Sequence, residues 1–330
     1  MLGWMEGATE SADVRTASLR LAVQAPGGEP AEIAALTIAP ERPAGDAVLL
    51  FCVPGMTYTK EYWDFDRDHS FARAAAAAGH VVVAVDNLGT GESGRPVDGE
   101  ALTMAALAAA NAEALAAVQA LALTGDLVPG QPPLAPARTV GVGHSMGGGL
   151  VLLQQARQRG FDALAVLGFS NQPLAGIYDP HEREDELSDG ERLAWARQHV
   201  PPKIWASEWE AMAAYFELPR PGFRELFYLP DTAAELIAAD EARATVVPKT
   251  AAIETTVPGV TAAAAAALEV PVFLAYGAVD LSPDPLAEVA TYPAAPEIAL
   301  LRLASSAHCH NLSPDRRLLW RRLLAWAASA

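Results

Sequence analysis

Ser145 is the residue whose surroundings in the sequence most clearly suit chemistry. It stands at the centre of residues 143–147, which read Gly-His-Ser-Met-Gly and follow an apolar run. Residues 139–143 predict a short buried strand, and the glycines and leucines of 147–153 predict the start of a helix. A turn this sharp needs glycine because neighbouring backbone must come close, and it lifts the serine hydroxyl clear of the sheet. Unpaired N–H groups at the start of the helix would stabilise an oxyanion that develops beside that hydroxyl.

A serine hydroxyl is a weak nucleophile until a base takes its proton, and the base needs an acid to orient it. On an open α/β sheet both groups are expected just beyond the carboxyl ends of strands. Asp280 follows the expected strand 272–276, and His308 follows the expected strand 298–303. The order along the chain is therefore serine, aspartate, histidine, and we expect the three residues to act together.

Two nearby residues compete with this assignment. Asp284 could replace Asp280, but it lies farther along the same loop, between two prolines. His310 could replace His308; it comes two residues later, and we expect it to point to the opposite side. Both alternatives stay open, with Asp280 and His308 favoured. The side chain of His144 is expected to point away from the serine turn and to have a packing or surface role.

These features together resemble the α/β-hydrolase superfamily over most of residues 16–329, an insertion in the middle excepted. The resemblance rests on four segments in the family's order: the serine turn 143–147, the loop 86–96 with its Asp-x-x-Gly-x-Gly-x-Ser pattern, and the residues 277–280 and 305–308. It implies an α/β-hydrolase fold, with a mostly parallel central sheet flanked by helices and with a helical cap insertion.

The resemblance also implies a function. Ser145 would be acylated, His308 would take and return its proton, and Asp280 would fix the imidazole. The chain would then be a serine hydrolase that cleaves a hydrophobic carboxylic ester or lactone through an acyl-enzyme, without a cofactor. Three alternatives stay open: an acyltransferase or cyclase, a carbon–carbon bond hydrolase or lyase on the same fold, and a ligand-binding protein without catalysis.

The oxyanion hole implied by the resemblance consists of two backbone N–H groups, those of Met56 and Met146. This chain has Pro-Gly at 54–55, where members of the family commonly have His-Gly. Because that loop departs from the family pattern, Thr57 or Tyr58 could supply or supplement the donor expected from Met56.

The rest of the sequence alternates between expected strands and helices. Residues 17–23 and 32–38 predict an antiparallel hairpin across a Pro-Gly-Gly turn. Further buried strands are expected at 47–53, 80–85 and 164–169, and helices at 71–79, 102–123, 147–160 and 314–327. Strands that alternate with helices imply a mostly parallel sheet with helices on both faces.

The alternation stops between residues 177 and 263, where prolines divide the chain into short helical pieces. We therefore expect residues 177–263 to form a helical lid that is inserted into a core of residues 1–176 and 264–330. Trp209, Met212 and Phe216 would share one face of a helix, which could line a substrate pocket or simply pack the lid onto the core. The full set of candidate pocket residues is Tyr58, Trp209, Met212, Phe216 and Phe227.

The composition and charge of the chain favour some classes of binding partner and substrate over others. The chain has 330 residues, 51% of them hydrophobic, and a formal net charge of −17, which disfavours nucleic acid and anionic membrane surfaces. The lid segment, residues 177–260, carries 16 Asp or Glu against 8 Lys or Arg, so a small neutral hydrophobic substrate is favoured over coenzyme A thioesters or phosphorylated compounds.

Other signals in the sequence are weak. Two cysteines are too few for a disulfide framework. No metal-ligand spacing, secretory signal or membrane-spanning segment is evident, so a cytoplasmic protein is expected, and a homo-oligomer stays open.

Overall fold

A computed structural model describes residues 14–174 and 189–330 of the chain. Its centre is an eight-stranded sheet in the order β1-β2-β4-β3-β5-β6-β9-β10. The strands of this sheet are β1 (Val14–Ala25), β2 (Glu29–Pro40), β3 (Val48–Val53), β4 (Val81–Val85), β5 (Arg138–His144), β6 (Ala163–Leu167), β9 (Val272–Gly277) and β10 (Ile298–Leu303). The predicted fold class is confirmed.

The sheet is antiparallel at one edge and parallel elsewhere. β1 pairs with β2 as the expected hairpin, β2 pairs antiparallel with β4, and every later pairing is parallel. All six residues of β3 and all five of β4 are buried, as continuous apolar runs predict for strands covered on both faces. The parallel strands end at one edge, and this edge carries the residues discussed below.

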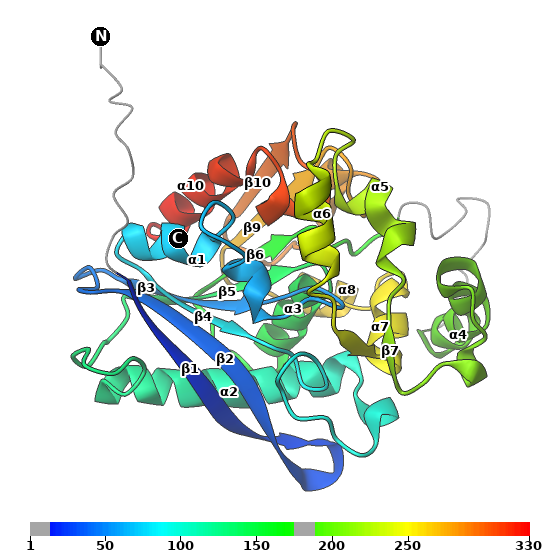
Figure 1. The fold of residues 1–330 in the computed structure, drawn as a ribbon, viewed down its shortest axis with the longest axis horizontal. Coiled ribbons are helices and arrows are strands. Elements are labelled where there is room, and N and C mark those ends of the chain that lie inside the picture. The colour runs from blue at the N-terminus through cyan, green and yellow to red at the C-terminus, as the bar shows by residue number, and fades with distance from the viewer. Residues whose placement is uncertain (1–13, 175–188) are drawn as a thin grey trace.

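Helices cover both faces of the sheet (Figure 1). α2 and α3 pack together on one face, and α1 and α10 pack together on the other. The core helices are α1 (Phe71–Ala77), α2 (Met104–Thr124), α3 (Met146–Gln158), α9 (Pro285–Glu288) and α10 (Arg316–Ala327), with short 3-10 turns η1 (Pro26–Gly28), η2 (Lys60–Trp63), η3 (Gly99–Ala101), η7 (Val289–Thr291) and η8 (His310–Leu312).

α2 begins and ends on residues that suit a helix terminus. The hydroxyl of its N-cap, Thr103, accepts from the backbone N–H of Ala106 at 3.0 Å, and Gly125 ends it in the left-handed conformation at φ 83°. α2 is also long and apolar enough to cross a membrane by length and composition, which differs from the expectation that no segment qualifies. It packs against β1 and α3, and its buried side, which includes Leu107, Leu115 and Val118, belongs to the core.

Between β6 and β9 the chain inserts a group of helices and short strands, called the cap below, whose residues line a pocket together with Met56, Ser145 and His308. These are α4 (Asp189–Trp205), η5 (Trp209–Ala211), β7 (Tyr215–Glu217), η6 (Arg220–Phe223), α5 (Arg224–Phe227), α6 (Ala234–Glu241), β8 (Val246–Pro248), α7 (Lys249–Thr256) and α8 (Ala262–Ala266). The first residues of the expected lid, 177–188, lie outside the described residues. The boundary of the lid as a separate unit stays a prediction.

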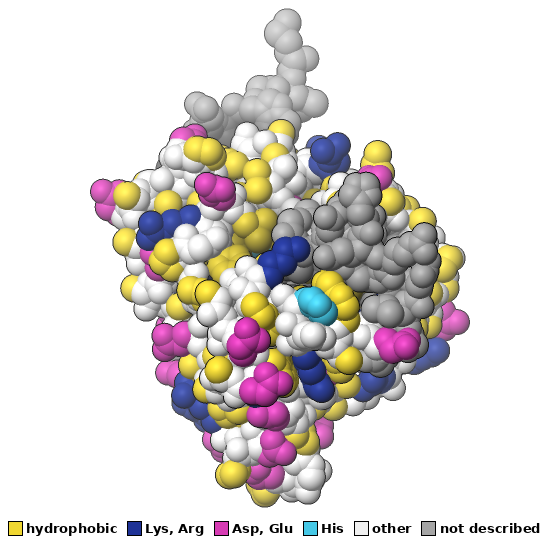
Figure 2. All heavy atoms as spheres, turned by 90° about the vertical axis from the view of Figure 1, so that its right-hand side faces the viewer, with side chains coloured by type: hydrophobic (Ala, Val, Ile, Leu, Met, Phe, Trp, Pro, Cys, Tyr) yellow, Lys and Arg dark blue, Asp and Glu magenta, His cyan; other side chains and the backbone are white. Residues whose placement is uncertain are grey.

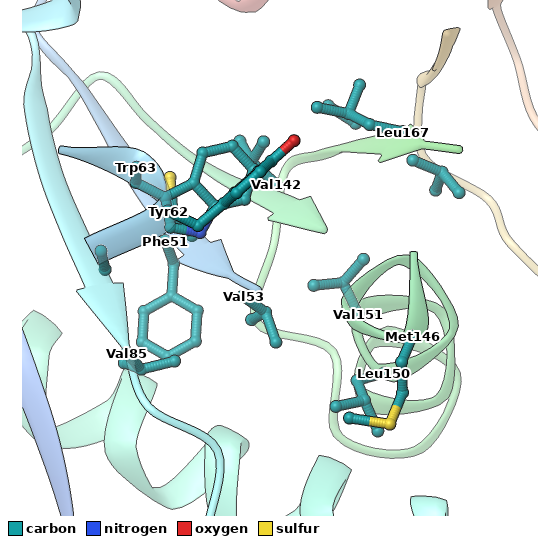
Figure 3. Packing of buried hydrophobic residues seen from close by; sticks show 14 of the residues in the cluster. Phe51, Val53, Tyr62, Trp63, Val85, Val142, Met146, Leu150, Val151 and Leu167 are labelled. Atoms are coloured by element: carbon teal, nitrogen blue, oxygen red, sulfur yellow. The ribbon is translucent and has the colours of Figure 1, made fainter. Parts of the chain in front are cut away.

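Buried apolar residues join the sheet to its helices in one cluster. Figure 3 shows this packing at α3, where Met146, Leu150 and Val151 lie near Val53 of β3. The contact leaves no room at the start of α3. A Cβ atom on Gly147 would lie 2.2 Å from the carbonyl oxygen of Val53.

Replacing Gly147 by alanine should therefore force the backbone of β3 and α3 apart. We expect Gly147→Ala to lower the free energy of unfolding by at least about 3 kcal/mol, measured by urea denaturation. Gly222→Ala is the matched control, because a Cβ there meets nothing within 4 Å, and it should change stability by less than about 0.5 kcal/mol. Equal stability of the two variants would contradict this account of the turn.

Candidate active site

Ser145 sits on a strained turn between β5 and α3. Its backbone has φ 53° and ψ −127°, a region that residues other than glycine rarely occupy. Two backbone hydrogen bonds hold it there, from Ser145 N–H to Leu167 O at 2.8 Å and from Gly148 N–H to Ser145 O at 2.7 Å. A Cβ on Gly143 would lie 2.2 Å from the carbonyl oxygen of Gly147, so the turn requires glycine there. The predicted strand-to-helix turn is thus the one observed.

The carboxylate of Asp280 accepts four hydrogen bonds. Its Oδ1 lies 2.7 Å from His308 Nδ1 and 2.8 Å from the N–H of Leu281, and its Oδ2 lies 2.8 Å from His310 Nε2 and 2.8 Å from the N–H of Gly277. Burial by itself would raise the pKa of Asp280, but the charge and hydrogen bond of His308, together with those of His310, hold this pKa well below its usual range. Asp280 is therefore a carboxylate at neutral pH.

The Asp280–His308 pair lies at the carboxyl edge of the sheet beside the serine turn. Gly168, which follows β6 with φ 61°, makes room for it: a Cβ there would lie 3.0 Å from His308 Nδ1 and 3.1 Å from Asp280 Oδ1. Because Nδ1 of His308 faces Asp280, Nε2 is the ring nitrogen left for another partner. His308 and Ser145 line the same pocket.

Asp284, the alternative acid, has a different place. It is the N-cap of α9, where its Oδ1 accepts from the N–H groups of Leu286 at 3.0 Å and Ala287 at 3.3 Å. An aspartate before the first turn of a helix commonly does this. The geometry therefore brings Asp280, and not Asp284, to the histidine.

The expectation that His310 points away from His308 is wrong. Residues two apart point to the same side even of an extended chain. Here Cys309 has φ −79° and ψ 75°, and the N–H of His310 donates to the carbonyl oxygen of His308 at 2.9 Å. This is an inverse γ-turn, which folds the chain back over one residue. Both imidazoles contact the carboxylate of Asp280, His308 at Oδ1 and His310 at Oδ2. Of the two, only His308 lines the pocket.

His144 is buried and supports the backbone of the loop after β10, residues 304–309, called the histidine loop below. Its Nε2 lies 2.8 Å from the carbonyl oxygen of His308, and its ring stacks on Tyr62 with centroids 4.5 Å apart. Burial, followed by the charges of His308 and His310, lowers the pKa of His144 well below its usual value, so that the imidazole is neutral and donates through Nε2. The packing role is the one expected, but His144 also lines the pocket beside Ser145 instead of pointing away from it.

The loop after β3 reaches Ser145 from the other side. A Cβ on Gly55 would lie 2.9 Å from Ser145 Cβ, and Met56 lines the same pocket as the serine. Met146, the first residue of α3, follows Ser145 directly. The N–H of Tyr58 donates to the carbonyl oxygen of Gly55 at 3.2 Å, which leaves Met56 and Thr57 as the candidates for a second oxyanion donor.

Asp86 ties the loop after β4 to the segment that follows Met56. Its Oδ1 accepts from the N–H of Lys60 at 2.6 Å, and its Oδ2 accepts from the N–H of Glu92 and from Lys60 Nζ, both at 2.9 Å. Lys60 Nζ also donates to Glu92 at 3.0 Å. Asp86 thus organises backbone on both sides of this edge and stands outside the reacting groups.

The pocket above Ser145 encloses about 580 Å³ of space free of protein atoms, counting its open mouth. No Asp, Glu, Lys or Arg stands among the described residues that line it. The lining consists of Met56, Tyr58, His144, Ser145, Leu174, Ile204, Trp205, Leu218, Phe223, Leu226, Phe227, Thr255, Thr256, Leu281 and His308. Two of the five predicted pocket residues, Tyr58 and Phe227, are in this set.

Trp209, Met212 and Phe216 do not line the pocket, and the helix that was to align them is absent. Residues 209–211 form the 3-10 turn η5, and residues 215–217 form β7, which pairs antiparallel with β8. The indole of Trp209 lies 4.5 Å from Lys249 Nζ, and the ring of Phe216 packs on Trp205 at 5.0 Å. The expected helical spacing does not hold because the segment is partly extended.

Within residues 14–174 and 189–330, no group of three or more His, Cys, Asp or Glu side chains is arranged to hold a metal ion.

The lowered pKa of His144 predicts a pH dependence of stability. Below about pH 6.5 the unfolded chain protonates this imidazole and the folded chain does not, so stability falls as the pH falls. Between pH 7 and pH 5 this costs at most about 2 kcal/mol. Urea denaturation at both pH values should show that His144→Gln, which keeps a donor for His308 O, loses less stability on acidification than the wild type.

The exposed His199 provides the control for this experiment. Between pH 7 and pH 5, His199→Gln should lose as much free energy of unfolding as the wild type does. If His144→Gln and His199→Gln respond alike, the imidazole of His144 is not held neutral by the fold.

Comparison with known proteins places the chain in a family. A family model described as the Alpha/beta hydrolase family matches residues 50–319. No curated protein matches the chain.

Several solved structures are similar in fold. One is an esterase from Thermogutta terrifontis with malate bound, at 18% identity and a TM-score of 0.59, covering 95% of this chain and 100% of that one. An esterase from Exiguobacterium antarcticum has 16% identity and a TM-score of 0.59 over 94% and 100% of the two chains. The enol-lactonase from Burkholderia xenovorans LB400 has 15% identity and a TM-score of 0.58 over 94% and 100%.

The family match over more than half of the chain agrees with the sheet order and with the serine turn after β5. This chain belongs to the alpha/beta hydrolase family.

Proposed function

We propose that the protein is a serine hydrolase that cleaves a small, neutral, hydrophobic carboxylic ester or lactone through an acyl-enzyme. The observation that carries the proposal is the 2.7 Å contact between His308 Nδ1 and the ionised Asp280, with His308 and Ser145 lining the same pocket. Membership in a hydrolase family supports the same reading.

The reaction would begin with the serine. Ser145 Oγ attacks the carbonyl carbon of the ester while Nε2 of His308 takes the hydroxyl proton. The carbonyl oxygen becomes an oxyanion, which the backbone N–H groups of Met146 and Met56 stabilise by hydrogen bonds. The C–O bond to the alcohol then breaks, His308 returns the proton to the leaving oxygen, and the acyl group stays on Ser145. Water activated by His308 releases the acid and restores the serine.

Asp280 serves this proton transfer without taking the proton itself. Its hydrogen bond to Nδ1 fixes the tautomer of His308 that carries a lone pair on Nε2, and its charge stabilises the imidazolium that forms. A carboxylate with so low a pKa remains ionised while His308 cycles between its two states. The bond from His310 occupies the other carboxylate oxygen, so Asp280 cannot rotate freely away from His308.

The pocket supports a neutral apolar substrate. Burying a charged group among side chains such as Ile204, Trp205 and Leu218 would cost several kcal/mol, because no described lining residue offers an opposite charge. The net charge of −17 adds a repulsive field for anions. Figure 2 shows the face on the cap side of the molecule, where Asp and Glu side chains gather toward the lower end.

A fluorophosphonate probe, which reacts only with an activated serine, tests the assignment of the three residues. Ser145→Ala should lose labelling completely, and His308→Ala should slow it by about 10²–10⁴-fold because the general base is gone. Asp280→Asn should also slow labelling strongly, because an amide can hold the imidazole in the wrong tautomer. Rates are read from the labelled fraction against time.

Matched variants complete this test. Ser170→Ala, Asp284→Asn and His310→Ala should each keep most of the labelling. Fast labelling of Ser145→Ala would refute the nucleophile. A larger loss in His310→Ala than in His308→Ala would reverse the choice of base.

The proposed substrate class predicts discrimination against charge. The p-nitrophenyl ester of hexanoic acid should be cleaved with a kcat/KM at least about 100-fold above that of the p-nitrophenyl monoester of adipic acid, which adds a terminal carboxylate. Methylating that carboxylate should restore most of the rate. Equal kcat/KM values for the charged and methylated esters would contradict a neutral pocket.

A further inference from the structure

A buried ion pair of the cap, Arg220 with Asp240, lies outside the groups of the proposed reaction. Arg220 Nη1 is 2.7 Å from Asp240 Oδ2, and the two side chains are 3% and 1% exposed. The same carboxylate oxygen accepts hydrogen bonds from the hydroxyls of Tyr58, at 2.7 Å, and Tyr228. Neither Arg220 nor Asp240 is among the described residues that line the pocket.

The pair holds the loop that carries the proposed oxyanion donor. Arg220 Nη2 donates to the carbonyl oxygen of Thr57 at 2.7 Å, and its guanidinium lies 3.9 Å from the centre of the Tyr58 ring. The N–H of Thr245, also in the cap, donates to the same carbonyl at 3.1 Å. Two cap donors and one buried ring contact therefore fix the two residues directly after Met56.

Thr57 needs this support because its backbone is strained. It has φ 63°, a conformation that is rare for a β-branched residue, and it is fully buried. Such strain persists only where the surroundings impose it, and it is concentrated at functional sites. Without the two donors to its carbonyl oxygen, Thr57 would be free to relax and to carry the N–H of Met56 with it.

Stability alone does not account for the pair. Two charges taken out of water lose their hydration, and a well-packed apolar pair of similar size is often as stable or more so. The arrangement is also incompletely satisfied, because Arg220 Nε has no hydrogen-bond partner among the described residues. The planar guanidinium of Arg220 donates to Asp240 and to the carbonyl oxygen of Thr57 at the same time, which apolar side chains could not do.

The same part of the cap holds the histidine loop. The N–H groups of His308 and Cys309 donate to the carbonyl oxygens of Leu226 and Phe227, at 3.1 and 3.2 Å. The hydroxyl of Tyr58 lies 3.0 Å from Cys309 Sγ as well as against Asp240. The ion pair thus lies where the cap, the histidine loop and the loop that carries Met56 (residues 54–59, called the oxyanion loop below) meet.

We propose that Arg220, fixed by Asp240, is a positioning residue that holds the strained oxyanion loop in the conformation that stabilises the transition state. This inference rests on the proposed serine hydrolase function. It assigns to the cap a part in rate acceleration, in addition to covering the pocket. Because Arg220 acts through the loop and does not contact substrate, its loss should affect the transition state more than substrate binding.

Steady-state kinetics with p-nitrophenyl butyrate, together with two inhibitors, test this inference. In Arg220→Gln we expect kcat to fall about 10–100-fold while KM changes by less than about threefold. The inhibition constant of a trifluoromethyl ketone, which forms an oxyanion on the serine, should rise by about the same factor as kcat falls. The inhibition constant of the corresponding secondary alcohol, which forms no oxyanion, should stay unchanged.

Arg224 offers a matched control in the same segment. It forms a 2.6 Å ion pair with Glu241, the neighbour of Asp240, but it is half exposed and does not touch the oxyanion loop. Arg224→Gln should keep wild-type kcat and wild-type affinity for both inhibitors. Arg220→Lys keeps a cation beside Asp240 but lacks the two-pronged guanidinium, so its kcat and its affinity for the trifluoromethyl ketone should lie between those of Arg220→Gln and the wild type. If Arg220→Gln does not fold, the Arg220→Lys variant provides the test.

Two results would overturn this inference but not the proposed function. In the first, the Arg220 variants have the same kcat and the same affinity for the trifluoromethyl ketone as Arg224→Gln. In the second, kcat falls but the affinity for the trifluoromethyl ketone does not. A wild-type protein that neither cleaves the ester nor reacts with a fluorophosphonate would overturn the proposed function, and the inference with it. An active wild type separates the two cases.

Discussion

The site depends on close approach of backbone segments that leaves no space for side chains. Gly143 and Gly147 let the strained turn at Ser145 pack against β3, Gly55 lets the oxyanion loop touch the serine, and Gly168 makes room for His308 and Asp280. Each of these glycines follows or ends a parallel strand or opens the helix after it, at the same edge of the sheet. The parallel register brings the loops to one place, and the missing Cβ atoms let them come within contact of one another.

The loops at this edge have no repeating ladder of backbone hydrogen bonds. Buried carboxylates hold them instead, by accepting hydrogen bonds from backbone and side-chain donors of several loops. Asp86 accepts from two backbone N–H groups and Lys60, Asp280 accepts from two N–H groups and two imidazoles, and Asp240 accepts from two tyrosines and Arg220. A buried carboxylate is costly unless it is hydrogen-bonded, so each of the three favours one arrangement of its donors. Of the three, only Asp280 contacts a residue of the proposed proton transfer.

Local patterns in the sequence were enough to predict the elements that carry the site. The apolar runs of β3 and β4 and the glycines around Ser145 identify a parallel sheet and a strand-to-helix turn, and the predicted strand 298–303 has the bounds of β10. Contacts that depend on distant or irregular backbone were not predictable. The shared contact of His308 and His310 with Asp280 depends on the turn at Cys309, the place of Phe216 follows from its pairing with Val247 of β8, and Arg220 meets Thr57 across 163 positions of the chain.

In the proposed reaction Ser145 carries the acyl group. The most direct test of this step is to mix the protein with p-nitrophenyl trimethylacetate, whose bulky acyl group slows attack by water, to quench with acid during turnover, and to map the peptides by mass. The account predicts a trimethylacetyl group on the peptide that contains Ser145, in an amount that approaches one per chain and matches the initial burst of p-nitrophenol. Product formation without any acylated peptide, or with the acyl group on another residue, would contradict it.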